Sequence, residues 1–355
     1  MLPLSLLQVQ DRPTVGPIAP IVHAERAWTA DVARRGDIAF DLDAATNREI
    51  RAAMDFVRAN GLDLDTVEQE DFRVPRFARA VPDLRRRLDS GCGIVVIRGI
   101  DLDPYDDGET GIVAWGLGNY LGRPIRQALK RDRRLFSVTD KGSGYGDPTR
   151  IGATTGESRP HTDNGCLEPR PPCYIGLLCV HQAASGGTSR VLSAVSVHNA
   201  FLRERPDLIG LLYEPFHFRP PQLHAWPKGP PTIVKPIFER IDGELRIHYA
   251  RVMVEPGMAM AGTPIDPRQR EALDLLDDIL ARDDLAFSHA LQRGEFLVIN
   301  NLATVHGRGA YADAPQANGR RLLQRIWLWR RHVGPGLDPV ALDAREFPAE
   351  HQPTG

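Results

Sequence analysis

Residues 294–308 read GEFLVINNLATVHGR, and this stretch decides much of the fold. Gly294 and Glu295 indicate a tight turn, and the apolar run 296–300 has the length of one buried strand. A polar turn follows and leads to His306. A lone histidine in such a place is more often a hydrogen-bonded structural residue than a ligand, so a site here needs partners from other parts of the chain.

Apolar periodicity on both sides of this stretch predicts strands with a few inserted helices. Helices are expected at 44–60, 194–204 and 267–282, the last two capped by Ser193 and Asp266. Strands are expected at 93–99, 174–180, 189–192 and 322–329, with a hairpin over 237–249 that turns at Asp242-Gly243. Antiparallel strands with few helices favour a mainly β fold with helical additions, a jelly-roll barrel, over a regular alternation of strands and helices.

The composition is that of an ordinary globular protein, with 355 residues, 42% of them hydrophobic. Lys and Arg number 44 and Asp and Glu 46, and the resulting net charge of −2 argues against a nucleic-acid partner. No apolar run approaches the ~20 residues that span a bilayer, and the first residues lack the basic region of a signal peptide. We therefore expect a cytoplasmic protein with no membrane partner. The cysteines match no zinc spacing and are expected to be reduced thiols: Cys92, Cys166, Cys173 and Cys179.

The strongest local signal for chemistry is His161-Thr162-Asp163. In an extended segment residues i and i+2 point the same way, so both side chains can face one metal ion. A second histidine from elsewhere would complete a set of two histidines and one carboxylate, which leaves other positions of the ion open. The pattern is weak by itself, and His23-Ala24-Glu25 repeats it in a segment that offers no partners.

Two further segments could hold an anion. Along 320–329, RRLLQRIWLW, strand alternation places Arg321 and Arg325 on one face and Arg320 on the other. An arginine inside a barrel needs a counter-charge, which the carboxylate of a ligand would supply. In Gly186-Gly187-Thr188 the glycines allow a ligand to approach the backbone closely, and the threonine offers a hydroxyl.

The order and spacing of HTD, GGT, NN-x₄-HGR and RRLLQR resemble the iron(II)/2-oxoglutarate oxygenases of the taurine dioxygenase and clavaminate synthase superfamily (TauD/TfdA-like). The resemblance implies a double-stranded β-helix and hydroxylation of an unactivated C–H bond of a small molecule, with Fe(II), 2-oxoglutarate and O₂ as cofactors and release of succinate and CO₂. It also implies roles for individual residues. Iron would bind to His161, Asp163 and His306; the distal carboxylate of 2-oxoglutarate would bind to Thr188 and Arg321; and Arg325 would lie near the co-substrate or an anionic substrate.

The resemblance runs from about residue 90 to residue 332 and suggests how the chain is organised. We expect one catalytic domain over 1–355, with an N-terminal extension at 1–90 whose helix packs on the barrel, a jelly-roll core at 91–332 and a tail at 333–355. Residues 141–160 are rich in Gly, Ser, Thr and Pro and are expected to form a lid over the site.

Gly294-Glu295 and Asn300-Asn301 depart from the Gly-Asp and Asp-Asn that relatives often have, and we expect neither pair to touch a proposed ligand. Relatives that halogenate lack the carboxylate ligand, so Asp163 favours oxygenation. Desaturation and cyclisation remain open at the same site, as do a zinc hydrolase and a non-catalytic jelly-roll binding protein. The histidines outside the motifs are expected to be structural or exposed: His181, His198, His217, His224, His248, His289, His332 and His351.

Overall fold

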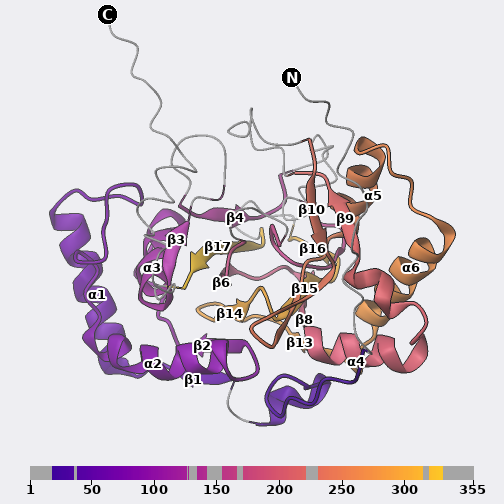
Figure 1. The fold of residues 1–355 in the computed structure, drawn as a ribbon. Helices are drawn as coiled ribbons and strands as arrows, with labels where there is room; N and C mark the ends of the chain where they lie inside the picture. The colour runs from indigo at the N-terminus through magenta and orange to yellow at the C-terminus, as the bar shows by residue number, and fades with distance from the viewer. Residues whose placement is uncertain are drawn as a thin grey trace, which may run out of the picture.

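Two antiparallel sheets form the centre of the protein (Figure 1). The computed structural model describes residues 18–35, 38–125, 127, 134–141, 154–165, 171–220, 231–314 and 320–330. The larger sheet has the order β1 (Ala39–Asp41), β2 (Ile94–Arg98), β14 (Phe296–Asn300), β6 (Tyr174–His181), β17 (Leu322–Trp329) and β3 (Arg123–Ile125), with β4 (Phe136–Val138) also paired to β17. The smaller sheet has the order β13 (Ala286–His289), β8 (Ser189–Ser193), β15 (Thr304–Arg308) and β5 (Ser158–His161). All neighbours are antiparallel except β1 and β2, which are parallel.

The sheets pack face to face through one apolar cluster. Ile94, Leu297 and Trp327 of the larger sheet share this cluster with Val191 and Phe287 of the smaller sheet. This arrangement confirms the expected mainly β class with helical additions and agrees with a jelly roll. The smaller strand pairs are β9 (Pro215–Phe218) with β10 (Ile233–Pro236), β11 (Phe238–Ile241) with β12 (Glu244–Ile247), and β7 (Ser185–Gly186) with β16 (Tyr311–Ala312).

Helices cover the sheets on opposite sides (Figure 1). A second apolar cluster joins the larger sheet to α1 (Ala44–Ala59), α2 (Pro75–Asp89) and α3 (Asp107–Leu121). A third joins the β9–β12 region to α4 (Ala194–Glu204), α5 (Arg251–Met260) and α6 (Pro267–Ala281). Two 3₁₀ helices, η1 (Ala30–Arg35) and η3 (Ile209–Tyr213), complete the described elements.

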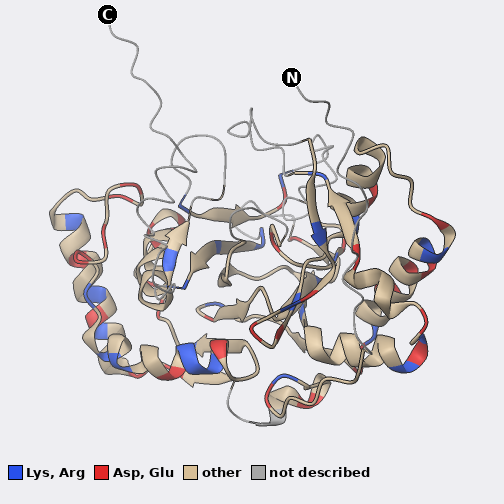
Figure 2. Ribbon diagram, in the orientation of Figure 1, with Lys and Arg blue, Asp and Glu red and all other residues tan. Residues whose placement is uncertain are grey.

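Local signals account for the elements that the sequence predicted. The Ser193 hydroxyl accepts a hydrogen bond from the Ser196 amide at the start of α4, and the Asp266 carboxylate caps α6 in the same way. Asp242 and Gly243 both have positive φ, 54° and 83°, as the predicted hairpin turn requires. Lys, Arg, Asp and Glu are mixed in sign along α1 and α6 (Figure 2), which agrees with the nearly balanced charge of the chain.

Three helices were not predicted, although α2 has an amphipathic face and α3 begins with a capping box. The helix α3 is buried on nearly all sides, so its residues show no amphipathic repeat. The helices α2 and α5 contain Pro82 and Pro256, residues that normally indicate a break. Of the expected lid, residues 142–153 lie outside the described residues, and Ser158–His161 belong to β5. Within the described ranges, none of the helices combines the length and apolarity needed to cross a bilayer.

Candidate metal centre

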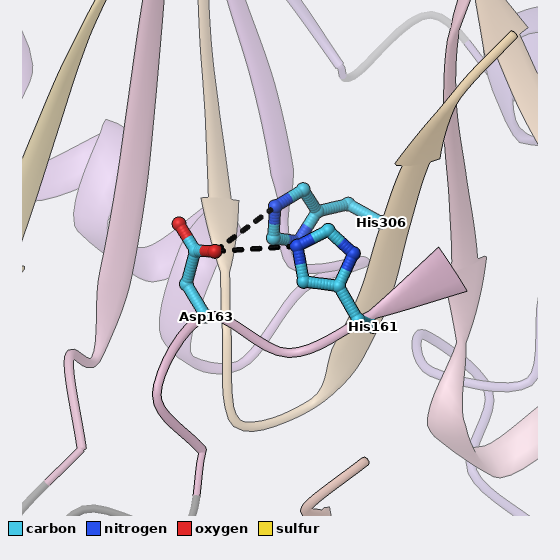
Figure 3. Close-up of side chains that lie close together, drawn as sticks. All are labelled: His161, Asp163 and His306. Carbon is cyan, nitrogen blue, oxygen red and sulfur yellow. Dashed lines mark ion pairs between the residues drawn. The ribbon is translucent and has the colours of Figure 1, made fainter. Parts of the chain in front are cut away.

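Strand pairing brings together two histidines that are far apart in the sequence. His306 lies in the middle of β15, and its Cα partner on β5 is His161. The two imidazole rings lie 4.6 Å apart between centroids. Asp163 follows two residues after His161 and turns its carboxylate toward both rings (Figure 3).

The three side chains form one compact group of metal-binding atoms. One potential ligand atom from each of His161, Asp163 and His306 lies within 4.8 Å of the others. The Oδ1 atom of Asp163 lies 3.3 Å from Nε2 of His161 and 3.9 Å from Nε2 of His306. Two imidazoles and a carboxylate on one side of an ion suit iron in a site that keeps other positions open.

The surroundings favour the protonation states that metal binding needs. Burial alone would raise the pKa of the Asp163 carboxyl, but the Arg325 guanidinium and the neighbouring histidines hold it well below its usual range. Burial and the nearby His161 ring lower the pKa of His306 to about 3. At neutral pH the group therefore offers an ionised carboxylate and a neutral His306 imidazole.

Thr162, which separates the two ligand candidates of the motif, is fixed by the backbone of Tyr249. The Thr162 amide donates to the Tyr249 carbonyl oxygen at 2.7 Å, and the Tyr249 amide donates to the Thr162 hydroxyl at 3.0 Å. Only 3% of Thr162 is exposed. This contact spans 87 positions in the chain, and no local signal in the sequence indicates it.

Arg321 is a buried cation without a full set of partners. Only 4% of the residue is exposed, its guanidinium lies 5.1 Å from the centre of the Tyr311 ring, and its Nη1 atom has no hydrogen-bond partner among the described residues. Burial lowers its pKa. Arg320, by contrast, is exposed, in agreement with the predicted alternation.

Gly187, the residue before Thr188, packs closely against this arginine. A Cβ atom on Gly187, whose φ is +74°, would lie 3.1 Å from Nε of Arg321. Gly187 therefore allows the backbone to pass close to the arginine, where a side chain would be crowded. Thr188 comes next in the chain and is partly buried, and its carbonyl oxygen accepts a hydrogen bond from the Gly309 amide. The Nη1 atom of Arg321, which has no hydrogen-bond partner among the described residues, can donate to the carboxylate of a ligand.

A match to a known family model shows to which family the chain belongs. Residues 60–327 match the model of the taurine catabolism dioxygenase TauD, TfdA family, which is more than half of the chain. The chain belongs to the TauD/TfdA dioxygenase family. Membership confirms the enzyme class expected from the motifs, an oxygenase that depends on Fe(II), 2-oxoglutarate and O₂.

Two curated proteins are similar to the chain over most of its length. FR-33289 synthase from Streptomyces rubellomurinus (strain ATCC 31215) is 30% identical over 294 residues, which are 81% of this chain and 84% of that protein. The taurine hydroxylase-like protein SAT17 from Stachybotrys chartarum (strain CBS 109288 / IBT 7711) is 24% identical, over 89% of this chain and 82% of that protein.

Among solved structures, asparagine oxygenase in complex with Fe(II), 2S,3S-3-hydroxyasparagine and succinate has a TM-score of 0.63 and 21% identity. It covers 82% of this chain, and 93% of its own chain is matched. The non-heme iron oxygenase OrfP in complex with Fe and alpha-ketoglutaric acid has a TM-score of 0.58 and 17% identity, with the same coverage of both chains. These structures share the fold of this TauD/TfdA member.

One expectation about the departures from the TauD/TfdA pattern is wrong. Asn301 does touch a proposed ligand, because its side-chain Oδ1 accepts from the Asp163 amide at 2.9 Å and its Nδ2 donates to the Asp163 carbonyl oxygen at 2.8 Å. Glu295, in the other departure, accepts hydrogen bonds from His289 and from the Gln292 amide. The polar turn after β14 thus lies against the HTD motif, which the sequence alone did not indicate.

The remaining histidine predictions concern residues away from the group. His23 accepts a hydrogen bond from the Arg26 amide and does not belong to the group of potential ligands. Five others each bond to a neighbouring side chain: His181, His198, His217, His248 and His289. His224, His332 and His351, like Cys166, lie outside the described residues, whereas Cys92, Cys173 and Cys179 are not joined in a disulfide.

Proposed function

We propose that His161, Asp163 and His306 bind the Fe(II) of this oxygenase, and that the enzyme hydroxylates an unactivated C–H bond of an amino-acid-like small molecule or natural-product intermediate. One observation carries the proposal: two histidines on paired strands and an ionised carboxylate converge within 4.8 Å. Bound Fe(II) supplies the redox chemistry that uses 2-oxoglutarate and O₂ to oxidise a C–H bond, with release of succinate and CO₂.

The residues of the chain bind and orient the reactants. His306 presents a neutral imidazole, because burial keeps it unprotonated at neutral pH, and Asp163 contributes the negative charge. Arg321, whose Nη1 has no partner within the part of the chain that the structure describes, receives the distal carboxylate of 2-oxoglutarate, and the Thr188 hydroxyl is its proposed second partner. The burial of Arg321 excludes water from this contact and strengthens it.

The substrate class rests on chemistry shared with relatives. Asparagine oxygenase and OrfP, which share the fold, form complexes with 2S,3S-3-hydroxyasparagine and with (3S)-hydroxy-L-Arg, and one relative in sequence is FR-33289 synthase. An anionic group of the substrate could approach Arg325, the third residue that the sequence assigned to the co-substrate region. Arg325 also donates from Nη1 to Asp163 and from Nε to Gln127.

The test combines binding and turnover. Under anaerobic conditions the protein should bind Fe(II), and 2-oxoglutarate should then bind only when the metal is present. With O₂, a screen of amino acids and their derivatives should identify compounds that accelerate succinate release and gain one oxygen atom. A product that loses two hydrogens would instead indicate desaturation or cyclisation. Hydrolysis that depends on zinc and ignores 2-oxoglutarate would refute the proposal.

A further inference from the structure

The two carboxylate oxygens of Asp163 have different surroundings. Oδ1 faces Nε2 of His161 and of His306, as Figure 3 shows. Oδ2 accepts two hydrogen bonds, from the Trp327 indole Nε1 at 2.8 Å and from the Arg325 Nη1 at 3.0 Å. A carboxylate oxygen has two lone pairs in its plane, so these two donors satisfy the hydrogen-bonding capacity of Oδ2. Oδ1 is then the oxygen available to a metal ion.

The backbone of Asp163 is held as firmly as its carboxylate. The Asn301 side chain bonds to both the amide and the carbonyl oxygen of Asp163, as the backbone of a neighbouring strand would. The side-chain Nδ2 of Asn301 also donates a third hydrogen bond, to the Pro172 carbonyl oxygen at 3.0 Å. Asn301 is fully buried, and its side chain therefore has a single well-defined position.

We propose that Trp327 is a positioning residue for the metal. Trp327 and Arg325 donate the two hydrogen bonds that Oδ2 of Asp163 can accept, and Asn301 fixes the backbone of Asp163. The carboxylate then binds the ion through Oδ1 alone. A carboxylate that binds through one oxygen occupies one coordination position, whereas one that binds through both occupies two. The donors thus keep open a position that the co-substrate and O₂ need. This inference rests on the proposed metal site and assigns new roles to Trp327 and Asn301 within it.

Trp327 offers a sharper test than Arg325, because the arginine also carries a charge and contacts Gln127. Trp327→Phe removes the indole N–H and retains an aromatic ring in the same place. Trp329→Phe is its matched control. Trp329 lies on the same strand two residues further on and is 4% exposed, against 6% for Trp327, but its Nε1 has no hydrogen-bond partner among the described residues.

Asn301 has a matched control in its neighbour. Asn301→Asp keeps an acceptor for the Asp163 amide and loses the two donated hydrogen bonds. Asn300 is equally buried, donates to the Leu88 carbonyl oxygen and accepts from the Leu302 amide, and has no contact with Asp163 among its hydrogen bonds. Asn300→Asp therefore measures how much stability and metal affinity are lost when a carboxylate replaces an amide at a buried position next to Asn301.

The experiment titrates Co(II) into the full-length protein and its variants, and reads both the affinity and the visible spectrum, which responds to the number of ligands on the ion. Thermal unfolding of each metal-free variant shows that it is folded. Trp327→Phe should bind Co(II) roughly 10- to 100-fold more weakly, the usual effect of removing a hydrogen bond to a ligand, and its spectrum should change. Trp329→Phe should match the wild type in both. Asn301→Asp should lose more affinity than Asn300→Asp.

Two results would overturn the inference, and they differ in meaning. If the wild type binds Co(II) and Trp327→Phe equals Trp329→Phe in affinity and spectrum, the indole does not position Asp163, and the metal site itself stands. If the wild type binds no Co(II), the proposed metal site fails, and this inference fails with it.

Discussion

Replacing Arg321 by leucine should weaken 2-oxoglutarate binding strongly without destabilising the ligand-free protein. Only 4% of Arg321 is exposed, and its Nη1 lacks a hydrogen-bond partner among the described residues. Truncating one partner of a buried charge pair costs about 2–5 kcal/mol. At about 1.4 kcal/mol for each factor of ten, the dissociation constant should rise roughly 30- to 4,000-fold.

The unfolding temperature distinguishes a role of Arg321 in ligand binding from a role in supporting the fold. A buried charge that lacks a full set of partners contributes little to folding, and an apolar side chain of similar volume is often neutral or stabilising in its place. Arg321→Leu should therefore unfold at the same temperature as the wild type, or a higher one, when no 2-oxoglutarate is present. The wild type should gain stability when 2-oxoglutarate is added with metal, and the variant should not.

The assay is anaerobic calorimetric titration of 2-oxoglutarate into the iron-loaded protein, beside thermal unfolding with and without the ligand. Arg320→Leu is the control, because Arg320 is the neighbouring arginine and its side chain is exposed. The reasoning fails if Arg320→Leu loses the affinity and Arg321→Leu keeps it. It also fails if Arg321→Leu unfolds far below the wild type in the absence of ligand, since the arginine would then support the fold.

Three further predictions concern the metal, a buried histidine and a turn. Asp163→Ala should abolish Fe(II) binding measured by anaerobic titration, since the anionic ligand is lost, whereas His23→Ala should bind as the wild type does. Burial lowers the pKa of His198. Below about pH 6.5 the unfolded chain therefore binds a proton that the folded protein does not, and the free energy of unfolding decreases as the pH is lowered. Denaturant unfolding at about pH 7.5 and about pH 5.5 should show a larger loss for the wild type than for His198→Asn, and equal losses would contradict the assignment. Gly243→Ala should cost about 1–2 kcal/mol of unfolding free energy, because φ is +83°, and Gly210→Ala, with equal space and no positive φ, should cost less.

Sequence reasoning found the parts of the site that local patterns encode. The HTD motif, the histidine after β14 and the alternation of Arg320 and Arg321 are readable because each depends on residues a few positions apart. The contacts of Asn301 with Asp163 and of Thr162 with Tyr249 are not, because they join positions 138 and 87 residues apart. Which loops meet at the end of a barrel depends on the register of the whole sheet.

The same distinction explains the helices. The helix α6 was readable because it has a capping residue at Asp266 and an apolar face that repeats at helical spacing. The helix α3 has a capping box at Asp106 but lies buried between the larger sheet and α2, so apolar residues occur all around it. Periodicity reports a boundary between core and solvent, and an element that has no such boundary leaves no periodic signal.

The pairing of His161 with His306 also has a consequence for how the protein matures. The two residues are 145 positions apart, the difference between 306 and 161, and the pairing of β5 with β15 joins them. The hydrogen bonds on the Asp163 carboxylate come from β17, later still in the chain. When the HTD motif has just left the ribosome, β15 and β17 have not yet been synthesised. Contacts between residues so far apart in the sequence also form slowly. If iron binds to this group as proposed, its loading has to follow the pairing of β5 with β15 and the placement of β17, so only chains that have folded this far can hold it.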